Sequence, residues 1–282
     1  MAQVARARAP HARPRTIVGG AGPVLESREV EIGRGLKLEV IQGGQGPALV
    51  WLHGLTPSAA DDPMLQALAE RFAVTAPVLP GQKDLAELDR LPSLHDLVLA
   101  YDSVLEALDV GQAILVGHGF GGMLAAELAA HCPGRVKALA LVSPLGLWSD
   151  AYPVEDMFAL SPPELDELVW RGAAHRPPPT EAATVEDEIE RRIALAHALG
   201  GIAYYTWPIP ERGLAGRLYR IAAPALLLFP EADALVPAAY AQDFARGLAD
   251  SRIRALAGSH MAPYESPAEL ARIIGEFAAS AD

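Results

Sequence analysis

Short apolar runs alternate with amphipathic stretches along the chain from about residue 25 onward. Residues 29–32 and 36–41 alternate apolar and polar positions around Gly33 and Gly35, which predicts a hairpin of half-exposed strands. The later runs are mostly apolar, as in the buried strands of a parallel sheet. They cover residues 47–52, 74–79, 114–116, 136–142 and 225–229, and a short strand is expected at 252–256.

Helical patterns separate these strands. One helical stretch begins after Ser58 and Asp61 and runs through residue 72, and another begins at a capping box of Ser93 and Asp96 and runs through residue 108. Further helices are predicted directly after residue 122, over 237–248 and from residue 266 onward. The alternation of strands and helices predicts a mostly parallel sheet covered on both faces.

Residues 144–218 interrupt this alternation. They contain helix starts at Ser161 and Thr180 but no strand-like run. Tryptophans and tyrosines gather in this segment: Trp148, Tyr152, Trp170, Tyr204, Tyr205 and Trp207. We therefore expect a helical insertion that covers the end of the sheet and forms a mostly apolar pocket.

Composition and charge narrow the function classes. A net charge of −12 argues against a nucleic-acid partner, and the single cysteine excludes an internal disulfide and a multi-cysteine metal site. We expect residues 1–24 to form a flexible basic tail, because no apolar run of signal-peptide length follows the arginines there. No run of about 18 apolar residues occurs anywhere in the sequence, so no membrane span is expected. We expect a cytoplasmic protein that binds a small molecule without a membrane or nucleic-acid partner. No cofactor or metal motif is found, and the sequence predicts no oligomeric state.

The densest local signal is the segment Gly117-His118-Gly119-Phe120-Gly121, which lies between an apolar strand and an alanine-rich helix. A strand that turns this sharply into a helix needs small residues beside the turn, because a Cβ there would collide with the backbone. This is the layout of a nucleophile elbow, Gly-x-Ser-x-Gly, with Gly119 at the serine position. Gly117, Gly119 and Gly122 also fit the Gly-x-Gly-x-x-Gly spacing of a dinucleotide loop, but they follow about the fifth strand and not the first.

Four motifs, in this order, resemble those of the α/β-hydrolase superfamily. They are His53-Gly54 at the end of the third strand, the elbow at 117–122, an acid loop at 229–237 and a histidine loop at 258–263. The resemblance implies an α/β-hydrolase fold with its core in 25–143 and 219–282 and a helical cap over 144–218, inserted after the sixth strand. Such caps occur in the esterases, C–C bond hydrolases, dehalogenases and epoxide hydrolases of the superfamily. The chain departs from the family at Gly119, because serine is usual there and aspartate or cysteine replaces it in certain branches.

The resemblance also implies roles for residues of these loops. His260 would be the general base, and Asp233 the acid that orients its imidazole, with Glu231 as the nearest rival. The backbone amides of Leu55 and Phe120 would form the oxyanion hole. These groups survive the loss of a serine side chain, but a covalent acyl intermediate does not.

Six further residues are candidates for the substrate pocket: His53, Gly54, His118, Ser143, Trp148 and Trp207. Structural roles compete with this interpretation. His118 also fits a place packed behind the elbow, Ser143 fits a loop role, and the tryptophans fit packing within the cap.

Three functions stay open at this point. The first is a hydrolase by lineage for a small, mostly apolar ester, acyl or C–C substrate, whose serine was lost naturally or by design. The second is an enzyme that needs no nucleophile and uses His260, Asp233 and the oxyanion hole for proton transfer, lyase chemistry or direct attack by water. The third is a non-catalytic protein that binds a ligand in the capped pocket.

Overall fold

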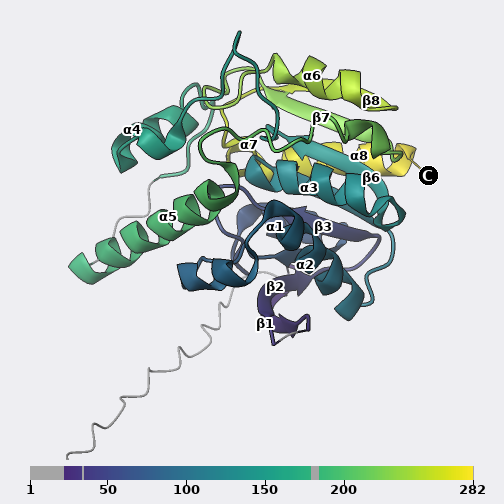
Figure 1. Ribbon diagram of the computed structural model, residues 1–282, viewed down its shortest axis with the longest axis horizontal. Helices are drawn as coiled ribbons and strands as arrows, with labels where there is room; N and C mark the ends of the chain where they lie inside the picture. The colour runs from purple at the N-terminus through teal and green to yellow at the C-terminus, as the bar shows by residue number, and fades with distance from the viewer. Residues whose placement is uncertain (1–21, 34, 179–183, 282) are drawn as a thin grey trace, which may run out of the picture.

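The computed structural model describes residues 22–33, 35–178 and 184–281. Eight strands form one sheet in the order β1-β2-β4-β3-β5-β6-β7-β8 (Figure 1). The strands are β1 Leu25–Glu31, β2 Lys37–Gly43, β3 Ala48–Leu52, β4 Ala73–Pro77, β5 Ala113–His118, β6 Val136–Val142, β7 Ala225–Pro230 and β8 Ser251–Leu256. β1 and β2 form the predicted antiparallel hairpin, β2 pairs antiparallel with β4, and the remaining neighbours are parallel. The expectation of a mostly parallel sheet is confirmed.

Helices cover both faces of this sheet. The helices in the described residues are α1 Pro63–Ala69, α2 Leu94–Ala107, α3 Phe120–His131, α4 Pro162–Val169, α5 Val185–Thr206, α6 Tyr240–Gly247, α7 Ala262–Glu265 and α8 Pro267–Ser280, with short 3₁₀ turns at Leu85–Arg90, Pro133–Arg135, Met157–Ala159 and Leu218–Arg220. α1 and α8 pack on one face, and α2, α3 and α6 pack on the other. In β3, Leu49 and Trp51 face the α1–α8 side while Val50 and Leu52 face the α2–α3 side, which explains why the whole run is apolar.

Several predicted helix boundaries move by a few residues. α1 begins at Pro63, directly after its cap Asp62, which accepts a hydrogen bond from the amide of Met64 at 2.8 Å, and it ends at Ala69 and not at residue 72. α6 begins at Tyr240 and not at residue 237. The amides of Tyr240, Ala241 and Gln242 each donate to the carbonyl three residues earlier, which is the tighter pattern of a 3₁₀ turn. The capping box of Ser93 and Asp96 is confirmed.

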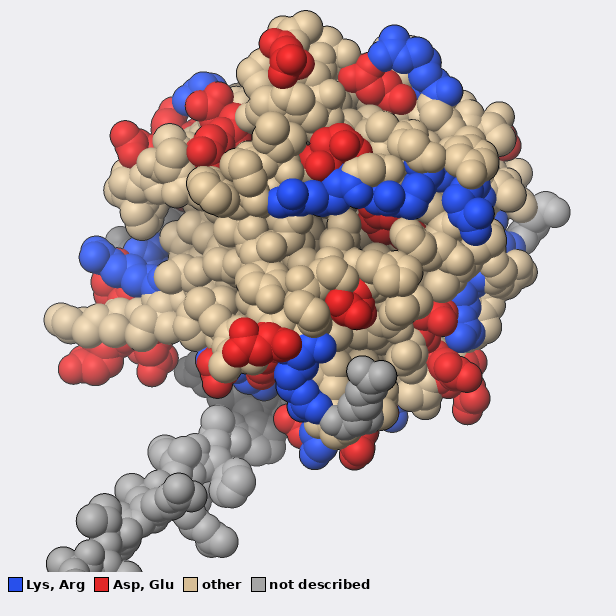
Figure 2. All heavy atoms as spheres, viewed as in Figure 1, with Lys and Arg blue, Asp and Glu red and all other residues tan. Residues whose placement is uncertain are grey.

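The segment between β6 and β7 contains α4 and α5, and its described residues include no strand. α4 begins after Ser161 as predicted. Thr180 lies outside the described residues, and Thr184 caps α5. α5 projects from the body of the molecule (Figure 1), and its buried residues all lie in its second half. Acidic side chains lie along its projecting end (Figure 2).

Residues 1–21 of the predicted basic tail lie outside the described part of the chain, and β1 starts at Leu25. None of the helices within the described ranges has the length and apolar character needed to cross a membrane.

Candidate active site

The chain turns from β5 into α3 at Gly119, whose backbone angles are φ 55° and ψ −117°. A positive φ is strained for a residue with a Cβ, whereas glycine adopts it freely. Close backbone approaches explain the neighbouring glycines: a Cβ on Gly117 would lie 2.2 Å from the carbonyl oxygen of Gly121, and one on Gly121 would lie 1.9 Å from that of Leu52. The strand–turn–helix geometry of an elbow is therefore present, with no side chain at its apex.

The structure brings His260 and Asp233 together beside this turn. Nδ1 of His260 donates to Oδ2 of Asp233 at 2.9 Å, and both side chains are buried. Oδ1 of Asp233 accepts hydrogen bonds from the amides of Leu235 at 2.9 Å and Val236 at 2.8 Å. This arrangement leaves the lone pair of His260 on Nε2, and a Cβ built on Gly119 would lie 3.4 Å from that nitrogen.

The environment of Asp233 favours its ionised form. Burial alone would raise the pKa of Asp233, but the neighbouring His260 and the hydrogen bonds from His260 and Val236 outweigh burial and lower it. The hydroxyl of Ser143 also lowers the pKa of Asp233. Ser143 is fully buried, and its backbone has a positive φ of 44°. Ser143 is therefore part of the surroundings of the acid.

Two other histidines support the loops around the site. Nε2 of His118 donates to the backbone carbonyl of His260 at 2.8 Å, and burial together with the nearby His260 lowers the pKa of His118 to about 3. His53 accepts a hydrogen bond from the amide of Leu79 at 2.9 Å and donates to the carbonyl of Gly54 at 2.9 Å, and burial lowers its pKa to about 4. Both rings are thus neutral and packed in the wall behind the site.

The two amides expected to form an oxyanion hole have no acceptor in the described part of the chain. Neither Leu55 nor Phe120 donates its amide hydrogen to another described residue. Cα of Gly54 lies 3.9 Å from the Cβ position at Gly119, so the loop that carries Leu55 faces the elbow. Free donors on both sides of one small space can stabilise a developing oxyanion.

A cavity of about 270 Å³ lies next to these groups, between the segment that contains α4 and α5 and the loops after β3 and before α7. Leu55, Thr56, Pro57 and Met261 line it from those loops, and Pro162, Leu165, Asp166, Val169, Trp170, Ala194, Leu195 and Ala198 line it from the α4–α5 segment. Leu55 carries one candidate oxyanion amide and Met261 follows His260, so the cavity adjoins the site. Its lining is mostly apolar, in keeping with the predicted pocket.

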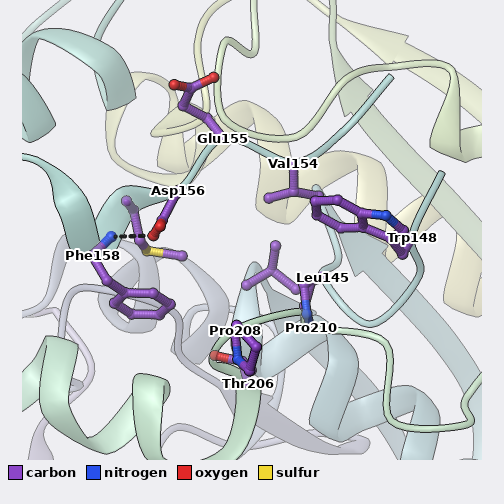
Figure 3. A pocket seen from close by; sticks show the side chains of 10 residues that line it. Leu145, Trp148, Val154, Glu155, Asp156, Phe158, Thr206, Pro208 and Pro210 are labelled. Atoms are coloured by element: carbon purple, nitrogen blue, oxygen red, sulfur yellow. Dashed lines mark hydrogen bonds between the residues drawn. The ribbon is translucent and has the colours of Figure 1, made fainter. Parts of the chain in front are cut away.

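A smaller cavity of about 50 Å³ is lined by residues of the segment between β6 and β7 (Figure 3). Trp148 and Leu145 line it, and the amide of Leu145 donates to the carbonyl of Gly119 at 3.0 Å. Trp207 differs from the prediction, because it is 58% exposed and lines neither cavity. Trp170 lines the larger cavity instead, together with Leu165 and Val169. The helical spacing of Leu165 and Val169 in the sequence could have indicated that this face of the helix is buried.

Metal ligands do not gather in the described residues: no group of three or more His, Cys, Asp or Glu side chains is arranged to hold an ion. Nε2 of His260 and the two free amides beside it can support proton transfer and stabilise a developing negative charge.

Comparison with known proteins agrees with the resemblance of the motifs to those of α/β-hydrolases. The model of the Alpha/beta hydrolase family matches residues 49–273. The chain is 31% identical to 2-(acetamidomethylene)succinate hydrolase of Mesorhizobium japonicum over 117 residues, which is 41% of this chain and 42% of that protein. It spans less than half the length of several other curated relatives as well.

Two longer matches extend the comparison. The magnesium-chelatase 30 kDa subunit of Rhodobacter capsulatus is 30% identical over 241 residues, 77% of this chain and 81% of that protein. The solved structure of 2-hydroxy-6-oxo-6-phenylhexa-2,4-dienoate hydrolase from Rhodococcus sp. strain RHA1 superposes with a TM-score of 0.69 at 18% identity, covering 90% of this chain and 98% of that one. The latter shows the shared fold. Because the family model covers most of the sequence, the chain belongs to the alpha/beta hydrolase family.

Proposed function

We propose that this protein acts on a small, mostly apolar ester, acyl or C–C substrate, and that Gly119 stands where its hydrolase lineage carries the serine nucleophile. The distance of 3.4 Å between Nε2 of His260 and a Cβ at residue 119 is the observation that carries the proposal. A serine hydroxyl, one bond beyond that Cβ, would come within hydrogen-bond reach of the imidazole. The hydrolase names of two similar proteins support the same reaction class.

In a chain with serine at position 119, each group has a defined task. His260 takes the hydroxyl proton as the oxygen attacks the substrate carbonyl carbon, and Asp233 stabilises the imidazolium that forms. The amides of Leu55 and Phe120 hold the oxyanion, and His260 returns the proton to the leaving group. Water then hydrolyses the acyl-enzyme by the same route. With glycine at position 119 the first covalent step has no nucleophile.

The test compares the unaltered chain with Gly119→Ser after treatment with a fluorophosphonate, with adducts measured by intact mass. Gly119→Ala is the control for the added Cβ, and Gly119→Ser combined with His260→Ala is the control for activation. We expect one adduct, on the serine variant alone. A folded serine variant without an adduct would contradict the proposal.

A second candidate is hydrolysis by the chain as it stands, with His260 deprotonating a water that attacks the substrate directly. It is favoured because Nε2 of His260 bonds to no other described residue and faces the space beside Gly119. Binding and an oxyanion hole alone typically leave about 10³–10⁴-fold acceleration over water. Turnover of p-nitrophenyl acetate by the unaltered chain should then fall in His260→Ala, and an unchanged rate would exclude this route.

A third candidate, ligand binding without turnover, is favoured by one relative: the Rhodobacter capsulatus protein is named as a chelatase subunit and not as a hydrolase. Its expected signature is a thermal shift of the unaltered chain with a non-hydrolysable methyl ketone analogue of a short ester. The shift should persist in His260→Ala. A shift that disappears with the imidazole would favour the catalytic candidates.

A further inference from the structure

The cap contacts both loops of the His–Asp pair through one short segment, residues 172–175, which we call the cap strap. Gly172 of the strap has φ 77° and lies against Ala232, the residue before Asp233: a Cβ on Gly172 would lie 2.4 Å from Cβ of Ala232. Two amides further along the strap donate to the carboxylate of Glu265. A single cap segment thus meets the acid loop and the histidine loop.

Glu265 is buried, 7% exposed, and its two oxygens serve different parts of the molecule. Oε1 accepts hydrogen bonds from the amide and the hydroxyl of Ser259, both at 2.6 Å. Oε2 accepts from the amides of Ala174 at 2.8 Å and His175 at 3.4 Å. Because Ser259 directly precedes His260, one carboxylate joins the cap strap to the loop of the base. Such a buried network holds its members in one arrangement only while each is satisfied.

The strap also continues the wall of the larger cavity. Val169 and Trp170 line that cavity and precede the strap by only a few residues. Directly after the strap, Arg176 pairs with Asp166 of α4 at 2.6 Å, and its guanidinium carbon lies 5.4 Å from the centre of the Trp170 ring. The wall of the cavity and the segment that Glu265 holds are therefore continuous along the chain.

We propose that Glu265 is a positioning residue that makes the alignment of His260 and Asp233 depend on the seating of the cap. When α4 and the strap are seated, Oε2 is occupied and Oε1 holds Ser259 in place. When they lift, Gly172 leaves Ala232 and the loops on both sides of the pair gain freedom together. Glu265 touches neither a substrate nor the reacting atoms. The catalytic consequence rests on the proposed function, whereas the coupling itself is a property of the fold.

Amide hydrogen exchange measured by mass spectrometry tests the coupling without any substrate. Peptides covering residues 170–178 and 256–262 are compared in the unaltered protein, Glu265→Ala, Glu265→Gln and Ile274→Ala. Ile274 is buried in α8 on the opposite face of the sheet, so Ile274→Ala is the control for lost stability alone. We expect Glu265→Ala to raise exchange at least tenfold in both peptides relative to Ile274→Ala.

The glutamine variant makes the test sharper, because its side chain keeps one acceptor oxygen and replaces the other by an NH₂ group. It can satisfy the strap or Ser259 but not both, so we expect a large increase in one peptide and a smaller one in the other. Equal increases in both peptides would contradict the assignment. So would a Glu265→Ala variant that loosens the histidine loop and leaves the strap unchanged.

The catalytic consequence is measured in the Gly119→Ser background by the rate of fluorophosphonate labelling. Adding Glu265→Ala should slow labelling about tenfold, while adding Ile274→Ala should change it less than twofold. Equal slowing by both would overturn a positioning role. If Gly119→Ser does not label at all, the proposed function fails, and the exchange experiment still decides whether Glu265 couples the cap to the pair.

Discussion

Gly119→Ala and Gly119→Ser place the same Cβ at the same strained backbone position, so their difference in stability measures the hydroxyl alone. Left-handed backbone angles cost a residue with a Cβ about 1–3 kcal/mol. Lower freedom of the unfolded chain returns about 0.4–1 kcal/mol. The new Cβ meets its nearest neighbours at 3.4, 3.7 and 3.9 Å, which are ordinary contacts and add no clash. We therefore expect alanine to lower the free energy of unfolding by about 1–2 kcal/mol.

Serine should recover part of this loss. Its hydroxyl can donate to Nε2 of His260, and a hydrogen bond of this kind contributes about 0.5–1.5 kcal/mol net. The serine variant should then be about 1 kcal/mol more stable than the alanine variant in urea unfolding at pH 8. In a His260→Ala background the difference should vanish, which completes a double-mutant cycle. Equal stabilities of Gly119→Ser and Gly119→Ala with His260 in place would refute the geometry of the site.

Three further predictions concern the framework around the site. Burial raises the pKa of Asp62 from 3.8 to about 6. Its protonated carboxyl therefore contributes stability that is fully present below pH 3.8 and is lost as the pH rises through about 6. Asp62→Asn should thus gain in unfolding free energy over the unaltered chain between pH 4 and pH 7, by up to about 3 kcal/mol, in urea titrations at several pH values. Arg217→Met should cost about 3–5 kcal/mol in urea unfolding, because the buried carboxylate of Glu127 loses a partner held at 2.6 Å, and adding Glu127→Leu should recover most of it. Gly121→Ala should leave no folded protein by circular dichroism, since its Cβ would lie 1.9 Å from a carbonyl oxygen at the end of β3, whereas Gly134→Ala, with nothing within 4 Å, should fold normally.

The tight turn at residues 117–121 could be predicted from the sequence because close backbone contacts restrict which residue types fit there. Gly117 is required by a contact with Gly121, and Gly121 by a contact with Leu52 of the adjacent strand. The capping box at Ser93 and Asp96 could be predicted because it spans only three positions. Apolar runs likewise predicted the strands, because both faces of the sheet are covered.

Which side chains of the segment between β6 and β7 face the larger cavity could not be predicted in this way. Trp170 lines the larger cavity while Trp207 is 58% exposed, although both are tryptophans in the same helical insertion. Which one is enclosed depends on how α4 and α5 pack on the core, and that packing joins segments far apart in the sequence. Glu265 and Ala174 meet across 91 positions, and no local pattern in the sequence indicates that contact.

The order of the His–Asp pair does not depend on residue 119. Asp233 is held by two amides of its own loop, and the backbone of His260 is held by His118. None of these bonds would weaken if a serine at the apex were lost, so the pair can persist after the nucleophile is gone. Its presence therefore does not decide between present activity and lineage. Turnover by the unaltered chain, compared with that of His260→Ala, distinguishes them, because Nε2 of His260 faces the place where a nucleophile or a water would react.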